Sequence, residues 1–139
     1  MNLENLARWA KIKGIDLLAS ADFTHPIWFE ECRKNLKDTV DGPFEYEGVK
    51  FILGSEIDTR GKQGGKIRRV HMLVFAPNFG AVERINTVFR SHGKLDFDGR
   101  PSLDLLPGEL LAAIKEIDQR CFVILVHLWT PWFGLYGAK

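Results

Sequence analysis

Short, continuous apolar runs alternate with helix-forming segments along this chain, and this alternation limits the possible folds. Four such runs have the length of strands: residues 15–19, 49–57, 70–75 and 121–127. Strands that are apolar on both faces are typical of a buried, largely parallel sheet that is covered by helices. The sequence therefore predicts a domain of the α/β class.

Segments with helical periodicity lie between these runs. The expected helices cover residues 2–13, 26–36, 77–89 and 107–120, and the last should turn Leu110, Leu111, Ile114 and Ile117 inward. Asn2 is the expected N-cap of the first helix and Gly14 its C-terminal stop. Pro26 suits a first helical position because its φ is already fixed. The polar segments are expected to be loops: residues 38–48, 58–69 and 93–102.

Length and composition favour a single domain. A chain of 139 residues can bury one core but not two. Its net charge of +1 creates no global field, so affinity for polyanions would have to come from local clusters. The longest apolar run, residues 121–126, is too short to span a bilayer, and the charged first helix does not resemble a secretory leader. We expect a cytoplasmic protein without membrane contact.

The two cysteines carry no metal-binding pattern. Cys32 and Cys121 are far apart and form neither a CxxC pair nor a Cys/His spacing. Both are interpreted as small buried side chains in a reducing compartment.

Imidazoles and carboxylates lie at or beside the ends of the apolar runs. Asp22 and His25 follow the first run, Glu56 falls late in the second, His71 opens the third and His127 ends the fourth. The carboxyl ends of strands are where α/β proteins gather their functional sites. Nitrogen and oxygen donors together suit zinc, manganese or iron. Each residue alone also permits a structural role, but together they favour a divalent-metal site.

Four of these segments resemble motifs of the PHP (polymerase and histidinol phosphatase) family. The matching stretches are DFTHP at 22–26, LGSEI at 53–57, VHMLV at 70–74 and ILVHLWTPWFG at 124–134. The last stretch, together with GKL at 93–95 and DGRP at 98–101, is most similar to the endonuclease Q subfamily. The resemblance extends over nearly the whole chain.

The resemblance implies a fold that is incomplete in this chain. Residues 1–139 would form part of a distorted (β/α)7 TIM-like barrel of the PHP type. The His-x-His strand that opens the family and the Asp-x-His motif that closes it have no match here. We therefore expect incomplete metal binding, weak or absent catalysis by this polypeptide alone, and self-association through exposed sheet edges.

The same resemblance implies a metal-dependent DNA endonuclease. Such enzymes cleave the phosphodiester 5′ to deaminated bases (hypoxanthine, uracil) or abasic sites. It makes His25, Glu56, His71 and His127 metal ligands, with Zn²⁺ the expected ion and Mn²⁺, Mg²⁺ or Fe²⁺ as alternatives. Glu56 and Asp22 are the catalytic candidates, Asp22 either as a further ligand or as a group that orients His25.

Basic and aromatic residues near these motifs are candidate substrate contacts. The candidates are Arg68, Arg69, Lys94 and Arg100 for phosphates, and Trp129 and Trp132 for a base. Lys and Arg supply sequence-independent affinity for DNA, and flat side chains can hold a base that has left the stack. The basic segment could equally be a solvated hairpin loop, and the aromatic residues could be ordinary core.

The sequence is also compatible with two other functions. A PHP phosphatase for a small phosphomonoester would need a deep closed pocket, whereas DNA would need an open basic groove. A catalytically inactive PHP-like fragment or binding module would explain the missing His-x-His strand.

Overall fold

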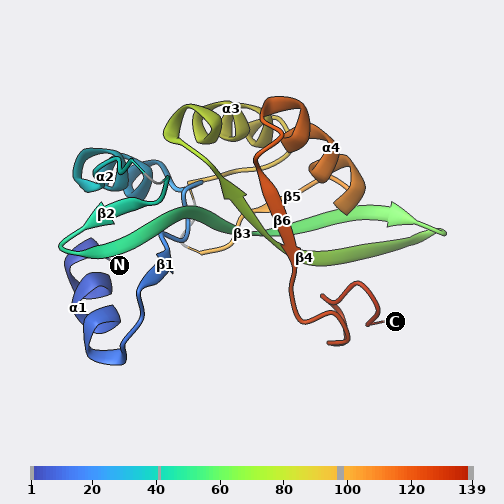
Figure 1. Ribbon diagram of the computed structural model, residues 1–139. Coiled ribbons are helices and arrows are strands. Elements are labelled where there is room, and N and C mark those ends of the chain that lie inside the picture. Colours follow the sequence, from blue (N-terminus) through green and yellow to red (C-terminus); the bar gives the residue numbers. More distant parts are fainter. Residues whose placement is uncertain (1, 41, 97–98, 138–139) are drawn as a thin grey trace.

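The computed structural model describes residues 2–40, 42–96 and 99–137. Figure 1 shows the arrangement of its helices and strands. In chain order these are α1 (Leu3–Lys13), β1 (Leu17–Ala19), α2 (Pro26–Asn35), β2 (Phe44–Tyr46), β3 (Val49–Gln63), β4 (Lys66–Ala76), α3 (Phe79–Arg90), β5 (Ser102–Leu103), α4 (Pro107–Ile117) and β6 (Phe122–Leu125). The predicted α/β class is confirmed.

Strand β3 organises the sheet. It pairs in parallel with β1 and β5, and antiparallel with β2 and β4. Strand β6 then adds antiparallel to β4, which gives the order β1-β3-β4-β6. The prediction of a largely parallel sheet is wrong, because the longest pairing joins two strands that follow each other directly. Over the described residues the sheet is mixed and does not close into a barrel.

The segment 58–69 was expected to be a loop, and this prediction is also wrong. Strand β3 continues to Gln63 and β4 starts at Lys66, so the two form one long hairpin. Gly64 and Gly65 turn the chain with φ values of 58° and 79°, the left-handed backbone of a two-residue hairpin turn. The far end of the hairpin is mostly exposed, so backbone pairing holds it together without apolar side chains.

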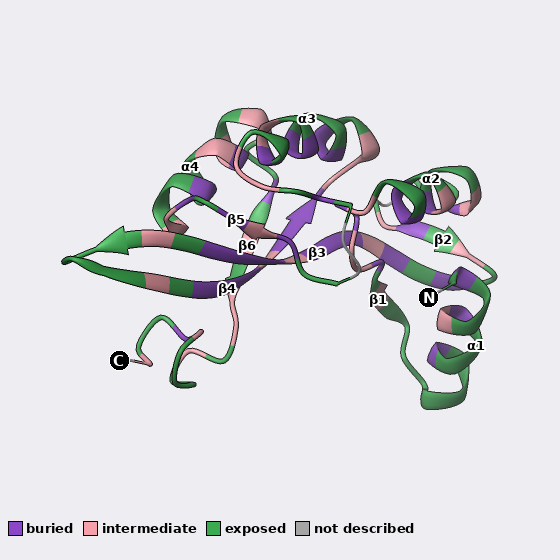
Figure 2. Ribbon diagram, turned by 180° about the vertical axis from the view of Figure 1, so that it is seen from behind, coloured by how far each residue is buried: buried purple, intermediate pink, exposed green. Residues whose placement is uncertain are grey.

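Helices α2, α3 and α4 lie on one side of β3, and α1 lies with β1 on the other (Figure 1). Figure 2 shows that the buried parts of α3 and of the central strands face one another. The largest fully buried side chains include Phe23, Phe51, Leu53, Ile57, Ile85, Phe89, Leu103, Leu110 and Ile114. No helix in the described ranges has the length and apolar character needed to cross a membrane.

Helix α4 differs from its prediction in two positions, Leu111 and Ile117. Leu110 and Ile114 are fully buried, as expected, but Leu111 is 40% exposed and Ile117 is only partly buried. Residues four apart share a helix face, whereas Leu111 lies about 100° further round the helix than Leu110. The buried stripe of α4 is therefore narrower than its apolar sequence indicates.

The predicted caps of α1 and the predicted start of α2 are confirmed, whereas α4 ends at Ile117 and not at residue 120. The side chain of Asn2 accepts a hydrogen bond from the Asn5 N–H at 2.8 Å, and Gly14 ends α1 with φ of 65°. Asn78 caps α3 in the same way through the Ala81 N–H. Pro26 opens α2. These local signals work because capping depends on residues close in sequence.

Both cysteines are buried and free. Burial raises the pKa of the Cys32 thiol to about 12, and burial likewise raises that of Cys121. The interpretation of both as small core side chains is confirmed, because such thiols stay protonated and pack as apolar groups.

Strands β1 and β6 are the ends of the sheet path. Leu17 on β1 is 48% exposed, and Phe122 and Ile124 on β6 are 46% and 47% exposed. Exposed apolar side chains on edge strands favour pairing with another chain. Self-association therefore stays a prediction that these edges motivate.

A close approach at Gly93 provides a test of the packing. A Cβ atom at Gly93 would collide with the Ser102 carbonyl oxygen and lie 2.9 Å from the Leu103 side chain, so α3 and β5 could not keep their spacing. We expect Gly93→Ala to lower the free energy of unfolding by about 1–3 kcal/mol in urea denaturation. Gly108→Ala is the matched control, because a Cβ atom there meets nothing within 4 Å. An equal loss of stability in both variants would contradict this account.

Candidate metal centre

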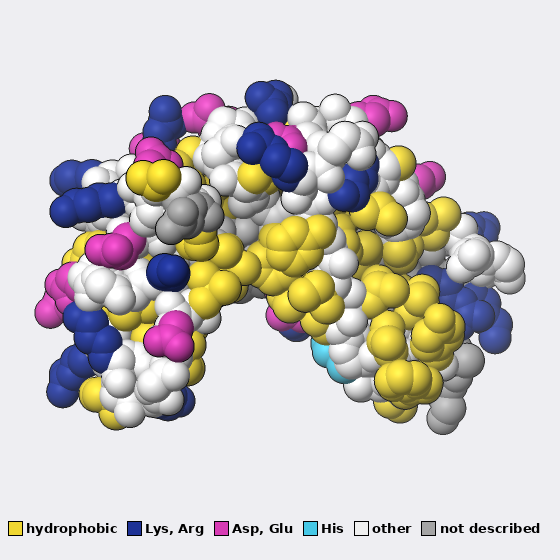
Figure 3. All heavy atoms as spheres, in the orientation of Figure 1, with side chains coloured by type: hydrophobic (Ala, Val, Ile, Leu, Met, Phe, Trp, Pro, Cys, Tyr) yellow, Lys and Arg dark blue, Asp and Glu magenta, His cyan; other side chains and the backbone are white. Residues whose placement is uncertain are grey.

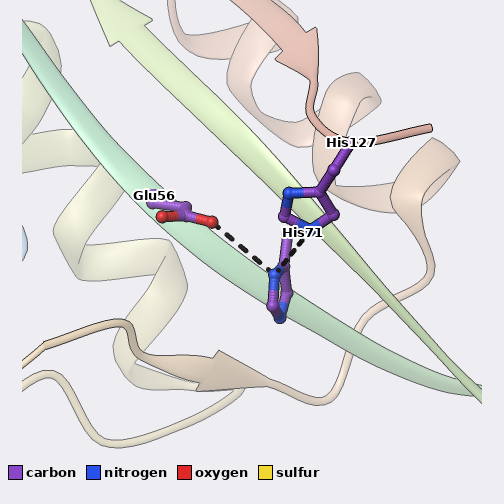
Figure 4. Close-up of side chains that lie close together, drawn as sticks. All are labelled: Glu56, His71 and His127. Atoms are coloured by element: carbon purple, nitrogen blue, oxygen red, sulfur yellow. Dashed lines mark hydrogen bonds and ion pairs between the residues drawn. The ribbon is translucent and has the colours of Figure 1, made fainter. Parts of the chain in front are cut away.

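Glu56, His71 and His127 come together on three neighbouring strands of the sheet (Figure 4). Glu56 lies on β3 and His71 on β4, and His127 lies two residues after Leu125, where β6 ends. His71 Nδ1 lies 3.6 Å from Glu56 Oε1 and 3.0 Å from His127 Nε2. One donor atom from each of the three residues lies within 4.8 Å of the others.

The register of the β3–β4 pairing brings the side chains of Glu56 and His71 together. Asp58 lies opposite His71, and Glu56 lies opposite Leu73. Since alternate residues of a strand share a face, Glu56, Asp58 and His71 project from the same side of the hairpin. Glu56 was expected near the carboxyl end of its strand, but it lies inside β3 because that strand continues to Gln63.

Strand β6 brings the third donor. It pairs with β4 up to Leu125, and the Val126 N–H donates to the His71 carbonyl at 3.4 Å. His127 then adopts a φ of 34°, a left-handed conformation that is uncommon for a residue other than glycine. The chain therefore turns away from the sheet at the residue whose imidazole contacts His71.

The three donors suit a transition-metal ion. Two imidazole nitrogens on a tetrahedral zinc ion, at about 2.0–2.1 Å each, lie about 3.3–3.4 Å apart. The separations of 3.0 Å and 3.6 Å between the atoms of this site lie on either side of that value. Three protein donors that leave a further coordination position open are the pattern of catalytic rather than structural zinc sites.

His71 is held in place by its surroundings. Its side chain is 5% exposed and stacks on Phe133, with ring centroids 4.4 Å apart and planes at 18°. The Phe133 carbonyl also accepts a hydrogen bond from the His71 N–H at 3.1 Å. Burial, and next the positive charge of Arg100, lower the pKa of His71. Both effects favour the neutral imidazole, which is the form that binds metal ions.

Arg100 lies against the candidate ligand Glu56. Its Nη1 donates to Glu56 Oε1 at a distance of 2.7 Å. The neighbouring Pro101 carbonyl accepts a hydrogen bond from the Asp58 N–H at 3.0 Å, which ties this loop to β3. The DGRP motif falls partly outside the described residues, because residue 98 is not described. Arg100, predicted as a phosphate contact, thus lies at the centre itself.

Asp58 is a residue of this site that sequence reasoning missed. Its side chain is 3% exposed, with Oδ1 3.7 Å from His71 Nε2. Arg69 clamps the same carboxylate through Nε, at 3.2 Å and 3.0 Å, and through Nη2. The available signal was its position two residues after Glu56, which places both carboxylates on one face of a strand. Asp58 was missed because residues 58–69 were interpreted as a loop.

Asp22 and His25 do not join the three donors among the residues that the structure describes. Their segment is nevertheless fastened beside Glu56. Thr24 and Ser55 share a hydrogen bond of 3.2 Å between their hydroxyls, and the Phe23 N–H donates to the Gly54 carbonyl at 3.4 Å. The N-cap position of α2 falls on His25, yet its side chain makes no capping bond. Its predicted role as a ligand stays a prediction.

Asp22 has an unusual backbone. Its φ is 43° and that of Ala21 is 56°, so two successive residues other than glycine are left-handed. The indole N–H of Trp28 donates to the Ala21 carbonyl at 2.7 Å and the Ser20 carbonyl at 3.0 Å, which fixes this turn. Such strain is often found at functional sites. The catalytic role of Asp22 stays a prediction.

Three of the other predicted substrate contacts line a cavity next to the centre. This cavity has a volume of about 980 Å³ and includes Arg68, Arg69, Trp132 and Phe133 in its lining. Trp129 lies outside it, 75% exposed, with its ring 6.2 Å from that of Tyr136. Lys94 is exposed on the loop after α3.

Figure 3 shows a hollow below the sheet, between the α1 part of the molecule and the segment after β6. Hydrophobic side chains gather on this side, and a histidine lies at the rim of the hollow. Of the three candidate donors, His127 is exposed, Glu56 is partly buried and His71 is buried, so the site is open to solvent on one side.

No family model matches this chain. Over its whole length the chain superposes on 33% of the lesion-specific endonuclease Q of Pyrococcus furiosus, with a TM-score of 0.82 and 31% identity. It also superposes on 33% of the endonuclease Q chain in a complex with a 27-mer duplex that carries an abasic lesion at the active site, with a TM-score of 0.83 and 32% identity.

One curated relative, an uncharacterised protein of Methanocaldococcus jannaschii, is 28% identical over 118 residues, which are 84% of this chain and 13% of the relative. The chain thus spans about a third of the solved structures that it matches and a smaller share of the curated relative. The predicted resemblance of this chain to endonuclease Q is confirmed at the level of the fold. The whole of this chain matches one third of the endonuclease Q chain.

Proposed function

We propose that this chain forms part of a metal-dependent DNA endonuclease of the endonuclease Q type. The phosphodiester that it cleaves lies 5′ to a deaminated base, such as hypoxanthine or uracil, or 5′ to an abasic site. The supporting observation is the meeting of Glu56, His71 and His127 within a fold that matches endonuclease Q over the whole chain. One matched structure is itself a complex with an abasic duplex, which supports DNA as the partner.

Glu56, His71 and His127 would hold the metal ion, and His25 and Asp22 are further candidates from the segment fastened beside them. Zn²⁺ is the proposed ion because two imidazoles and one carboxylate suit it, with Mn²⁺, Fe²⁺ or Mg²⁺ as alternatives. Such an ion supplies a Lewis acid and a bound water with a pKa of about 7 when it is present.

The chain's own residues would prepare the site for a phosphate group. Arg100 places a guanidinium beside Glu56, where it can offset negative charge that develops on the phosphate oxygens. Phe133 covers one face of His71 and limits its rotation. The exposure of His127 leaves the donor group open to solvent, which supports a polymeric substrate rather than a small phosphomonoester.

Residues further from the centre would contact the DNA. Arg68, Lys94 and Arg69 are proposed for the phosphates, and Trp132 for a base in the cavity of about 980 Å³. We also propose that residues 1–139 form one portion of a PHP-type distorted (β/α)7 barrel. A cytoplasmic location stays a prediction.

The metal site is tested by titration of the chain with Zn²⁺ against a chromophoric chelator. We expect one ion to bind, and His127→Ala to weaken its affinity by at least about tenfold, because one donor of the group is lost. His92→Gln is the matched control, since it also removes an imidazole but lies outside the donor group. Equal affinity in wild type and His127→Ala would contradict the site.

The proposed activity is tested with end-labelled duplexes that contain an abasic site, inosine or uracil, in the presence of Zn²⁺, Mn²⁺ or Mg²⁺. We expect a nick on the 5′ side of the lesion and its loss in Glu56→Ala. Glu83→Ala, which removes an exposed carboxylate paired with Arg33, should retain it. Hydrolysis of p-nitrophenyl phosphate without nicking would favour a phosphatase. A bound ion without either activity would favour a binding module.

The two tryptophans can be separated by their positions. Trp132 lines the cavity and Trp129 does not, so we expect Trp132→Ala to weaken binding of an inosine-containing oligonucleotide more than Trp129→Ala. Loss of one stacking partner costs about 1–3 kcal/mol of binding free energy, or about 5–150-fold in Kd. Trp9→Ala is the control, because Trp9 is an exposed tryptophan on α1. Fluorescence anisotropy measures the Kd, and unchanged binding in both variants would rule out a base contact by this pair.

A further inference from the structure

We infer that Asp58 is the positioning residue of the candidate metal centre. Its carboxylate fixes the tautomer of His71, so that Nδ1 is the nitrogen presented to the ion. This inference rests on the proposed function, since it assigns a role toward the same Glu56–His71–His127 group.

The two nitrogens of His71 face different partners. On one side, Nδ1 lies 3.0 Å from His127 Nε2 and 3.6 Å from Glu56 Oε1. On the other side, Nε2 lies 3.7 Å from Asp58 Oδ1. The β3–β4 register creates this arrangement by placing Asp58 directly opposite His71. One nitrogen thus faces the donor group and the other faces a carboxylate.

The carboxylate selects the tautomer by electrostatics. An unprotonated Nε2 would direct its lone pair at the negative charge of Asp58, whereas a protonated Nε2 is attracted to it. The selection does not require a hydrogen bond, because charge acts over 3.7 Å in a site where His71 and Asp58 are both buried. With the proton on Nε2, the lone pair of Nδ1 is free to bind an ion. Carboxylates commonly orient metal-bound histidines in this way.

Arg69 allows the carboxylate to be buried there. A buried Asp needs partners for its charge, and Arg69 provides them through a clamp on both carboxylate oxygens. The guanidinium carbon lies 5.3 Å from the centre of the Phe133 ring, which in turn stacks on His71. These contacts therefore connect His71, a member of the donor group, to a supporting group that consists of Asp58, Arg69 and Phe133.

Two alternative roles fit this geometry less well. Asp58 does not belong to the group of donors within 4.8 Å of one another, so a role as a ligand is not favoured. Arg69 binds Asp58 through its Nε and Nη2, so support of the centre is assigned to it in addition to the phosphate contact proposed above.

The test replaces the whole pair with apolar side chains of similar size, in Asp58→Leu/Arg69→Met. Such a replacement of a buried ion pair leaves no charge unpaired and is often tolerated. We expect Zn²⁺ affinity, measured by chelator competition, to fall by about 10–100-fold. The matched control is Asp104→Leu/Arg60→Met, which removes the exposed pair that joins β3 to the loop after β5. It should bind Zn²⁺ as the wild type does.

Nitrogen-15 NMR of the imidazoles in the metal-free chain provides a second readout. We expect His71, assigned with His71→Gln, to carry its proton on Nε2 in the wild type and in the Asp104 control. In the Asp58→Leu/Arg69→Met variant this tautomer should no longer predominate. A merely structural role of Asp58 would change the melting temperature, measured in parallel by circular dichroism, but not the tautomer.

The outcomes separate this inference from the proposed function. Wild-type Zn²⁺ affinity and an unchanged His71 tautomer in the double variant would overturn the role of Asp58. Absence of Zn²⁺ binding by the wild-type chain would instead overturn the metal site, while the tautomer would still report on Asp58. If the double variant does not fold, Asp58→Asn decides, because it keeps the size of the side chain and removes the charge that selects the tautomer. An affinity equal to that of wild type in Asp58→Asn would overturn the inference.

Discussion

The backbone hydrogen bonds between β3 and β4 set the positions of Glu56, Asp58 and His71 at the candidate centre. They place Asp58 opposite His71 and Glu56 two residues away on the same face. A slip of one residue would turn every one of these side chains to the other side of the hairpin. The register is secured from both ends: the Gly64–Gly65 turn closes the hairpin, and the fully buried Leu53, Ile57 and Val74 hold the opposite part in the core. The chemistry of the site therefore depends on a packing pattern outside it.

Charge at the centre is balanced in pairs. Arg69 neutralises the buried carboxylate of Asp58, and Arg100 lies on that of Glu56. His71 sits between these pairs, and burial keeps it in the neutral form. The two arginines differ in effect, because Arg69 stabilises a carboxylate behind the histidine, whereas Arg100 acts on a candidate ligand itself. An arriving phosphate or cation would thus change the partners of Glu56 more readily than those of Asp58.

The parts of the molecule that could be predicted from the sequence are those that depend on residues close together in the chain. Asn2 and Pro26 mark helix starts because caps depend on neighbouring residues. His71 and His127 were found because each follows or opens an apolar run. The far end of the hairpin was missed, since its polar side chains hide a pairing made by the backbone, although Gly64-Gly65 was a visible turn signal. Asp58 was missed although its spacing from Glu56 was a signal, because its segment was interpreted as a loop. The contact of Arg100 with Glu56 could not be predicted, because it follows from a loop that returns to β3 beside Asp58.

The three donors also differ in the order in which the chain can bring them together. Glu56 and His71 belong to one hairpin with a two-residue turn, so loop closure costs them little entropy. His127 is 56 residues beyond His71 and arrives only when β6 pairs with β4. We expect the donor group to be completed late in folding, after the hairpin has formed. An ion held by all three would therefore link β6 to the hairpin, and its binding free energy would add to the stability of this edge of the sheet.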